Sequence, residues 1–90
     1  QWLHSIMKEV LYSKTAQKAL MRMPRNWAIR IRDKISAYAD DPASQANNVK
    51  ALQGMDRMLR LRVGNWRIVM CDGVVLEILD IKARGSAYKE

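Results

Sequence analysis

The stretch RMLRLRVGNWRIVM, residues 57–70, holds two apolar-rich runs separated by a Gly-Asn pair. This pattern is the strongest short-range signal for a β-hairpin, so Val63 should pair with Trp66. Arg62 then lies opposite Arg67. Because side chains alternate between the two faces of a strand, the hairpin has one basic face and one more apolar face. The basic face carries Arg60, Arg62 and Arg67, and the other carries Leu59, Leu61, Trp66 and Ile68.

Two arginines directly across a ladder repel each other by a few tenths to about 1 kcal/mol. A fold that keeps Arg62 opposite Arg67 is therefore expected to hold the pair for an anion. On this interpretation, Arg67→Ala removes function but leaves stability nearly unchanged or slightly raised. The alternative is that these arginines only solubilise the open face of an antiparallel sheet.

The residues before this hairpin predict one strand and two helices. Residues 8–12 mix charged and β-favouring side chains, Ser13 is the expected N-cap of a helix over 14–23, and Pro24 ends that helix. A second helix over 25–40 completes an antiparallel helical hairpin. Its apolar stripe is expected to face the core and consists of Trp27, Ile31, Ile35 and Tyr38.

The C-terminal half predicts a meander that follows a polar loop over residues 43–48. Its strands are expected over 59–63, 66–71 and 74–81, with Asp72-Gly73 as a type I′ turn. A strict two-residue turn would place Glu77 on the face of Trp66 and Ile68, which a bulge or partial exposure would resolve. The predicted fold class is α+β: an N-terminal strand and a helical hairpin packed on a mainly antiparallel sheet that ends in the three-strand meander.

Length and composition predict one domain. We take Met7 as the initiator, so residues 7–90 form the domain and residues 1–6, with His4, are a cloning remnant or an upstream extension. Cys71 is the one cysteine, which is typical of a reducing cytoplasm. No apolar stretch has the length of a membrane helix, and no metal cluster or nucleotide loop can be assembled, so no cofactor or membrane partner is expected.

The charge balance predicts an acidic partner. The chain has 16 Lys+Arg against 9 Asp+Glu, a formal net charge of +7, which favours nucleic acid or an acidic protein segment over a merely solvated surface. Guanidinium groups bind phosphate oxygens bidentately, so the basic face resembles a phosphate clamp. The basic residues nearest to it are Lys50, Arg57, Arg60, Arg62 and Arg67, and Arg84 and Tyr88 follow the last predicted strand.

Four motifs in order resemble one family. LRLRVGNWRIVM is similar to the RLRVGDYRVIY hallmark of the RelE/ParE toxin superfamily of type II toxin–antitoxin systems, and KALMRMPRN, VKALQG and IKARGSAY resemble its other motifs. The resemblance covers Met7 to Tyr88 and implies a cognate antitoxin, hence a toxin–antitoxin hetero-oligomer. RelE-like members are ribosome-dependent endoribonucleases that cleave messenger RNA, whereas ParE-like members inhibit DNA gyrase.

The resemblance to the RelE-like branch implies a site without metal or cofactor, in which a ribose 2′-hydroxyl attacks the adjacent phosphate. Arg67 would stabilise the transition state, Arg84 would protonate or screen the leaving oxygen, and Tyr88 would orient or deprotonate the nucleophile, or stack on a base. Arginines stand at the first two positions where the best-studied branch has lysines. The alternatives are a ParE-like gyrase inhibitor and a non-catalytic basic module. The implied catalytic residues are Arg60, Arg62, Arg67, Arg84 and Tyr88, and the implied RNA-binding residues are Lys50 and Arg57.

Overall fold

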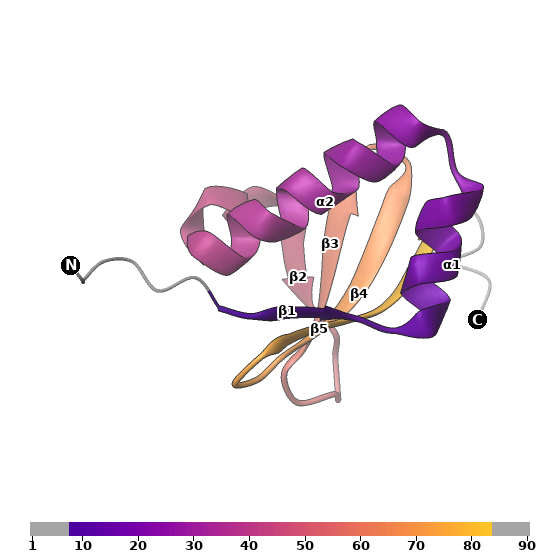
Figure 1. The fold of residues 1–90 in the computed structure, drawn as a ribbon. Helices are drawn as coiled ribbons and strands as arrows, with labels where there is room; N and C mark the ends of the chain where they lie inside the picture. Colours follow the sequence, from indigo (N-terminus) through magenta and orange to yellow (C-terminus); the bar gives the residue numbers. More distant parts are fainter. Residues whose placement is uncertain (1–7, 84–90) are drawn as a thin grey trace.

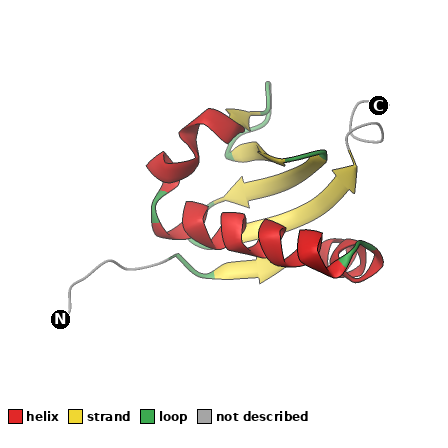
Figure 2. Ribbon diagram, turned by 90° about the horizontal axis from the view of Figure 1, so that it is seen from above, coloured by secondary structure: helices red, strands yellow, loops and turns green. Residues whose placement is uncertain are grey.

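Residues 8–83, the part of the chain that the computed structural model describes, form a five-stranded sheet with helices over one face (Figures 1 and 2). The strand order is β1-β5-β4-β3-β2. β1 runs parallel to β5, and the other neighbours are antiparallel. The predicted α+β class is thereby confirmed. The elements are β1 (Val10–Tyr12), α1 (Lys14–Arg22), α2 (Arg25–Asp40), the 3₁₀ helix η1 (Pro42–Asn48), β2 (Val49–Ala51), β3 (Met58–Val63), β4 (Trp66–Asp72) and β5 (Leu76–Ala83).

The helical hairpin begins and ends where the sequence predicts it, apart from one residue at the end of α1. The Ser13 hydroxyl accepts a hydrogen bond from the Ala16 N–H at 3.0 Å and donates one to the Leu79 carbonyl at 2.7 Å. Ser13 therefore caps α1 and also joins it to β5. Among residues 8–83, no helix is long and apolar enough to cross a membrane.

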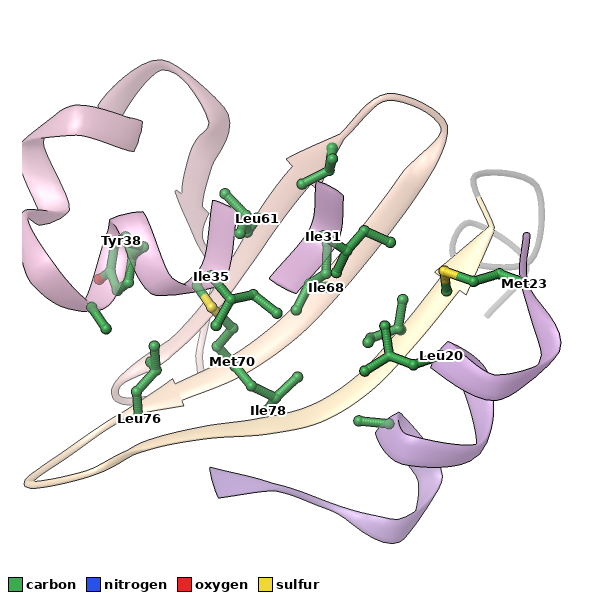
Figure 3. Close-up of a cluster of buried hydrophobic side chains, with 14 residues drawn as sticks. Leu20, Met23, Ile31, Ile35, Tyr38, Leu61, Ile68, Met70, Leu76 and Ile78 are labelled. Carbon is green, nitrogen blue, oxygen red and sulfur yellow. The ribbon is translucent and has the colours of Figure 1, made fainter. Parts of the chain in front are cut away.

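The core lies between the helices and the sheet (Figure 3). Ile31 and Ile35 are fully buried, as the helical stripe predicts, and Tyr38 is 6% exposed. Trp27 is only half-buried at the margin of the core, so it contributes less than the 3–5 kcal/mol typical of a fully buried tryptophan. The strands supply Leu61, Val63, Ile68, Met70, Leu76, Ile78 and Ile81 from the face that the helices cover.

Two short elements differ from the prediction of a polar loop followed by the meander. Residues 43–48 belong to η1, whose first turn is capped by the Asp41 carboxylate, which accepts from the Ala43 N–H at 3.2 Å. The next residues form β2, an edge strand antiparallel to β3, so the sheet continues one strand beyond the predicted meander. β2 has only three residues, too few for side-chain alternation to reveal it in the sequence.

The β4–β5 connection corrects the predicted two-residue Asp72-Gly73 turn. Asp72 still pairs with Leu76, so the loop consists of residues 73–75 and β5 begins two residues later than expected. A register shift follows, because Met70 pairs with Ile78 whereas Val69 pairs with Asp80. The longer loop moves Glu77 to the face away from the helices, and the bulge at Leu79 keeps Ile81 on the core side.

Candidate functional site

The β3–β4 hairpin forms as the sequence predicts. Val63 pairs with Trp66 and Arg62 pairs with Arg67. Gly64, the first central residue of the turn, has φ +57°, a conformation that glycine adopts without strain. Since Leu61 and Ile68 face the helices, the arginines of this ladder lie on the opposite, open face of the sheet.

Two rows of cations cross the open face. Near the turn, Arg67 has Arg62 on one side and Lys82 of β5 on the other. In the next row Lys50 of β2 lies beside Arg60. The sheet register thus brings residues from four strands onto one basic surface, the open-face cluster, which consists of Lys50, Arg60, Arg62, Arg67 and Lys82.

Arg67 is held at the base of this cluster. Arg67 is only 6% exposed. Its Nη1 donates hydrogen bonds to the carbonyls of Gly64 and Trp66, each at 3.1 Å. Carbonyl oxygens stabilise a partly buried cation, and they fix the guanidinium against the turn. The cross-strand repulsion from Arg62 is therefore opposed by hydrogen bonds that the sequence pattern did not predict.

A cavity of about 300 Å³ opens on the cluster. Its lining side chains are cationic or amide groups, which suit an anion: the former attract its charge and the latter donate hydrogen bonds. Lys82 lies outside this lining, and its ammonium is 3.8 Å from the Asp80 carboxylate. Among the described residues, the cavity is lined by Asn47, Asn48, Lys50, Arg60, Arg62 and Arg67.

Arg57 lies elsewhere. It is exposed, has φ +64°, and its carbonyl accepts from the Asp72 N–H at 2.9 Å, so it sits beside the β4–β5 loop at the other end of the ladder from the Gly64 turn. Its Nε is 3.8 Å from the Asp56 carboxylate. The structure therefore separates Arg57 from the open-face cluster. Arg84 and Tyr88 lie outside the described residues, and their roles stay predictions.

A cluster of three hydrogen-bonded polar side chains, Lys8, Tyr38 and Asp72, lies at the same end of the β3–β4 ladder as Arg57. The Asp72 carboxylate accepts hydrogen bonds from Lys8 and from the Tyr38 hydroxyl, the latter at 2.8 Å. Burial raises the pKa of Tyr38 to about 12, and the neighbouring carboxylate adds to the shift. Burial also acts to raise the pKa of Asp72, but the bonds from Lys8 and Tyr38 outweigh it and hold that pKa below its usual value. This group joins β4, α2 and the residues before β1.

Sequence reasoning missed the amides of Asn47 and Asn48 and the ammonium of Lys82. The asparagines could not be assigned because β2, which fixes their position, was not predicted. Lys82 continues the alternation of the last strand by one residue, a signal that the predicted end at Ile81 left out. Within residues 8–83 no group of three or more His, Cys, Asp or Glu side chains is placed to hold a metal ion.

The chain matches one protein family by sequence and several solved structures by fold. Residues 10–88 match the family described as the ParE toxin of type II toxin–antitoxin system, parDE. A search of curated protein sequences finds no match to the chain.

Among solved structures, the chain is similar to the archaeal RelE–RelB complex from Pyrococcus horikoshii OT3, with 24% identity and a TM-score of 0.76 over 89% of this chain and 98% of that one. The RelB–RelE antitoxin–toxin complex from Methanococcus jannaschii has 28% identity and a TM-score of 0.67 over 87% and 94% of the two chains. The isolated E. coli RelE toxin has 15% identity and a TM-score of 0.71 over 84% of this chain and 83% of that one. The chain therefore belongs to the ParE toxin family of type II toxin–antitoxin systems, within the RelE/ParE superfamily.

Proposed function

We propose that this toxin is a ribosome-dependent endoribonuclease that cuts messenger RNA and so inhibits translation. The observation that carries the proposal is the cavity on the open face, where Lys50, Arg60 and Arg62 surround Arg67. An RNA phosphate gains negative charge in the transition state of strand cleavage. Several fixed cations around that phosphate would stabilise the charge, which is usually the largest catalytic contribution.

In this proposal the 2′-hydroxyl attacks the adjacent phosphorus, its O–P bond forms as the P–O5′ bond breaks, and the products are a 2′,3′-cyclic phosphate and a 5′-hydroxyl. The hydroxyl proton must leave and the 5′ oxygen must gain one. Tyr88 and Arg84 are the residues that the family resemblance assigns to these two transfers. Arg67, fixed by the turn carbonyls, would hold its charge in place without reorganisation during the reaction.

In the proposed reaction the ribosome aligns the attacking 2′-hydroxyl with the phosphate. Fixing an attacking group in line with its target can contribute about 7–11 kcal/mol. A messenger held in the decoding site would have its 2′-hydroxyl positioned before the toxin binds. We therefore expect the toxin alone to bind RNA in a salt-dependent manner and to cut it slowly.

A cognate antitoxin is the proposed protein partner. The similar structures from Pyrococcus horikoshii and Methanococcus jannaschii are RelE–RelB complexes. An acidic or mixed-charge antitoxin segment would cover the open-face cluster, and an apolar helix or strand would add binding energy that salt does not screen. A complex that dissociates at about 1 M salt would contradict a substantial apolar contact.

Inhibition of DNA gyrase is the second candidate function. The observation that favours it is the match to the ParE toxin family over residues 10–88. A gyrase inhibitor would bind its target without cutting RNA, and the open-face cluster would then serve protein or DNA contacts.

One experiment separates the two functions. A labelled messenger is incubated with the toxin, free in buffer or loaded on ribosomes, and gyrase supercoiling is measured in parallel. We expect cleavage with 5′-hydroxyl ends that is much faster on loaded messenger than on free messenger, and we expect gyrase supercoiling to be unaffected. Arg62→Ala should lower cleavage strongly, whereas Arg25→Ala, which removes an exposed arginine outside the cavity lining, should not. Equal cleavage of free and loaded messenger would exclude ribosome dependence, and inhibited gyrase with intact messenger would favour the second function.

A further inference from the structure

The basic surface does not stop at the open-face cavity. The pairing of β2 with β3 ends at Leu61, which lies opposite Val49, so the last residues of β3 extend beyond their edge neighbour. At this corner a second cavity of about 700 Å³ lies between α2 and the end of β3. It shares three residues with the first cavity, so the two are contiguous. The polar side chains that line it are Arg30, Lys34, Asn48, Arg62 and Arg67.

Packing places the α2 cations at this corner. A side chain added at Gly64 would meet the Trp27 ring at 2.5 Å, which shows how closely the ring lies on the turn. The guanidinium of Arg30 lies over the same ring, 5.0 Å from its centroid, in a cation–π contact. Lys34 follows one helical turn later on the same side of α2. Both cations therefore lie next to the turn that holds Arg67.

We propose that Arg30 and Lys34 form a second phosphodiester site, which holds a phosphate next along the strand from the one in the open-face cavity. The bound strand would pass around the free edge of β3, with Arg62 and Asn48 shared between the two sites. A ligand with regularly repeated negative charges suits two contiguous cationic cavities better than a small anion, which would fill one of them. This inference rests on the proposed function in taking RNA as the ligand.

The test measures binding of a labelled single-stranded RNA to the toxin over a range of salt concentrations. The variant is Arg30→Gln/Lys34→Gln. The control is Lys14→Gln/Lys18→Gln, which removes the same charge from exposed positions on α1 that line neither cavity. Each phosphate contact contributes about 0.7 to the slope of log affinity against log salt for single strands. We expect the α2 variant to bind more weakly and its slope to be shallower by about 0.7–1.4, with the control near wild type.

The possible results are distinguishable. If the α2 variant and the control bind RNA equally, the second site is excluded. The second site is also excluded if the α2 variant loses affinity for an acidic antitoxin but keeps its affinity for RNA. If the wild-type toxin shows no salt-dependent RNA binding, the inference and the RNA-cleaving function fail together. If the α2 variant binds weakly but the wild type cuts no messenger on ribosomes, the second site stands and the nuclease proposal fails. Lys34→Gln alone, which leaves the Arg30–Trp27 contact intact, should give a smaller slope change and guards against a folding defect.

Discussion

The β3–β4 and β4–β5 hairpins share strand β4, but their turns are held in different ways. The first turn has Gly64 in a left-handed conformation, the Trp27 ring against it and Arg67 bonded to its carbonyl. The second is a three-residue loop whose tip, Val74, is 94% exposed. It is fixed at its base, where Asp72 binds Lys8 and Tyr38.

The difference shows which hairpin tolerates change. The Trp27 ring packs on the first turn and also carries Arg30, and the Gly64 carbonyl accepts from Arg67. The conformation of this turn and the basic surface are therefore coupled. The second turn is fixed by the hydrogen bonds of Asp72, which lies at the opposite end of β4 from Arg67 and does not line the open-face cavity. We expect substitutions at the first turn to alter stability and function together, and those at the second to alter stability alone.

The largest expected effect is that of Gly64→Ala. A left-handed non-glycine residue costs about 1–2 kcal/mol, and the overlap with the Trp27 ring, at 2.5 Å, adds up to about 1–3 kcal/mol if the ring must move. Urea unfolding would measure the loss. Gly73→Ala is the matched change in the other turn, where the nearest atom is at 3.7 Å, and it should shift stability by less than about 0.5 kcal/mol. Equal losses in the two variants would contradict the contrast between the turns.

Arg67→Ala is expected to have the next largest effect. Hydrogen bonds to a charged donor contribute about 1.5–3 kcal/mol, and relief of the Arg62 repulsion returns up to about 1 kcal/mol, so we expect a net loss of about 1–2 kcal/mol. Arg62→Ala, at an exposed position, relieves the same repulsion and leaves the Arg67 hydrogen bonds in place, so stability should stay near wild type or rise by up to about 1 kcal/mol. An Arg67→Ala protein as stable as wild type would support the simpler expectation from sequence, in which the repulsion dominates.

Tyr38→Phe tests the base of the second hairpin and should cost about 1 kcal/mol at pH 7. The pKa of Tyr38 is raised from 10.0 to about 12, so its contribution is complete below pH 10 and is lost as pH rises towards 12. The stability difference between wild type and variant should therefore shrink over this range. Denaturation at pH 7, 10 and 11.5 checks the trend, and a difference that grows with pH would contradict it.

The smallest expected effect is that of Arg57→Gly. It relieves a positive φ but adds chain entropy to the unfolded state, so stability should rise by a few tenths to about 1 kcal/mol at most. Because Arg57 lies before β3, beside the β4–β5 loop and outside the cavity lining, RNA binding should stay near wild type, while Arg62→Ala weakens it. Anisotropy with a labelled RNA measures both variants side by side. A similar loss of binding for the two would return Arg57 to the candidate site.

Local sequence signals predicted the first hairpin, its two faces and the helix boundaries. The Gly-Asn pair, the Ser13 cap and Pro24 each act through neighbouring residues, so no knowledge of the tertiary structure is needed. The same signals failed at Asp72-Gly73. Val74 and Val75 have the composition of a strand, but the register of β5 is set by its pairing with β1 and β4 and by the bulge at Leu79.

Side-chain alternation predicted the candidate site only where it lies on the hairpin itself, and Lys50, the one cavity-lining residue outside the hairpin that was named from sequence, was named from its charge and the family resemblance. Arg60, Arg62 and Arg67 follow from alternation, and the pairing of Lys50 with Arg60 follows once β2 is known. The carbonyl contacts of Arg67 depend on the backbone of the turn, which the sequence does not specify in such detail. The α2 cations reach the corner through tertiary packing, which periodicity alone does not reveal.

The parallel pairing of β1 with β5 has a consequence for folding kinetics. It joins distant parts of the chain, and the Ser13–Leu79 hydrogen bond spans 66 residues. Closing a loop of that length takes longer than forming either hairpin, so β1 should dock after the hairpins have formed. Until then β5 is an edge strand with unpaired backbone groups, open to pairing with another chain. The concentration of toxin during refolding would then decide between the native sheet and aggregation.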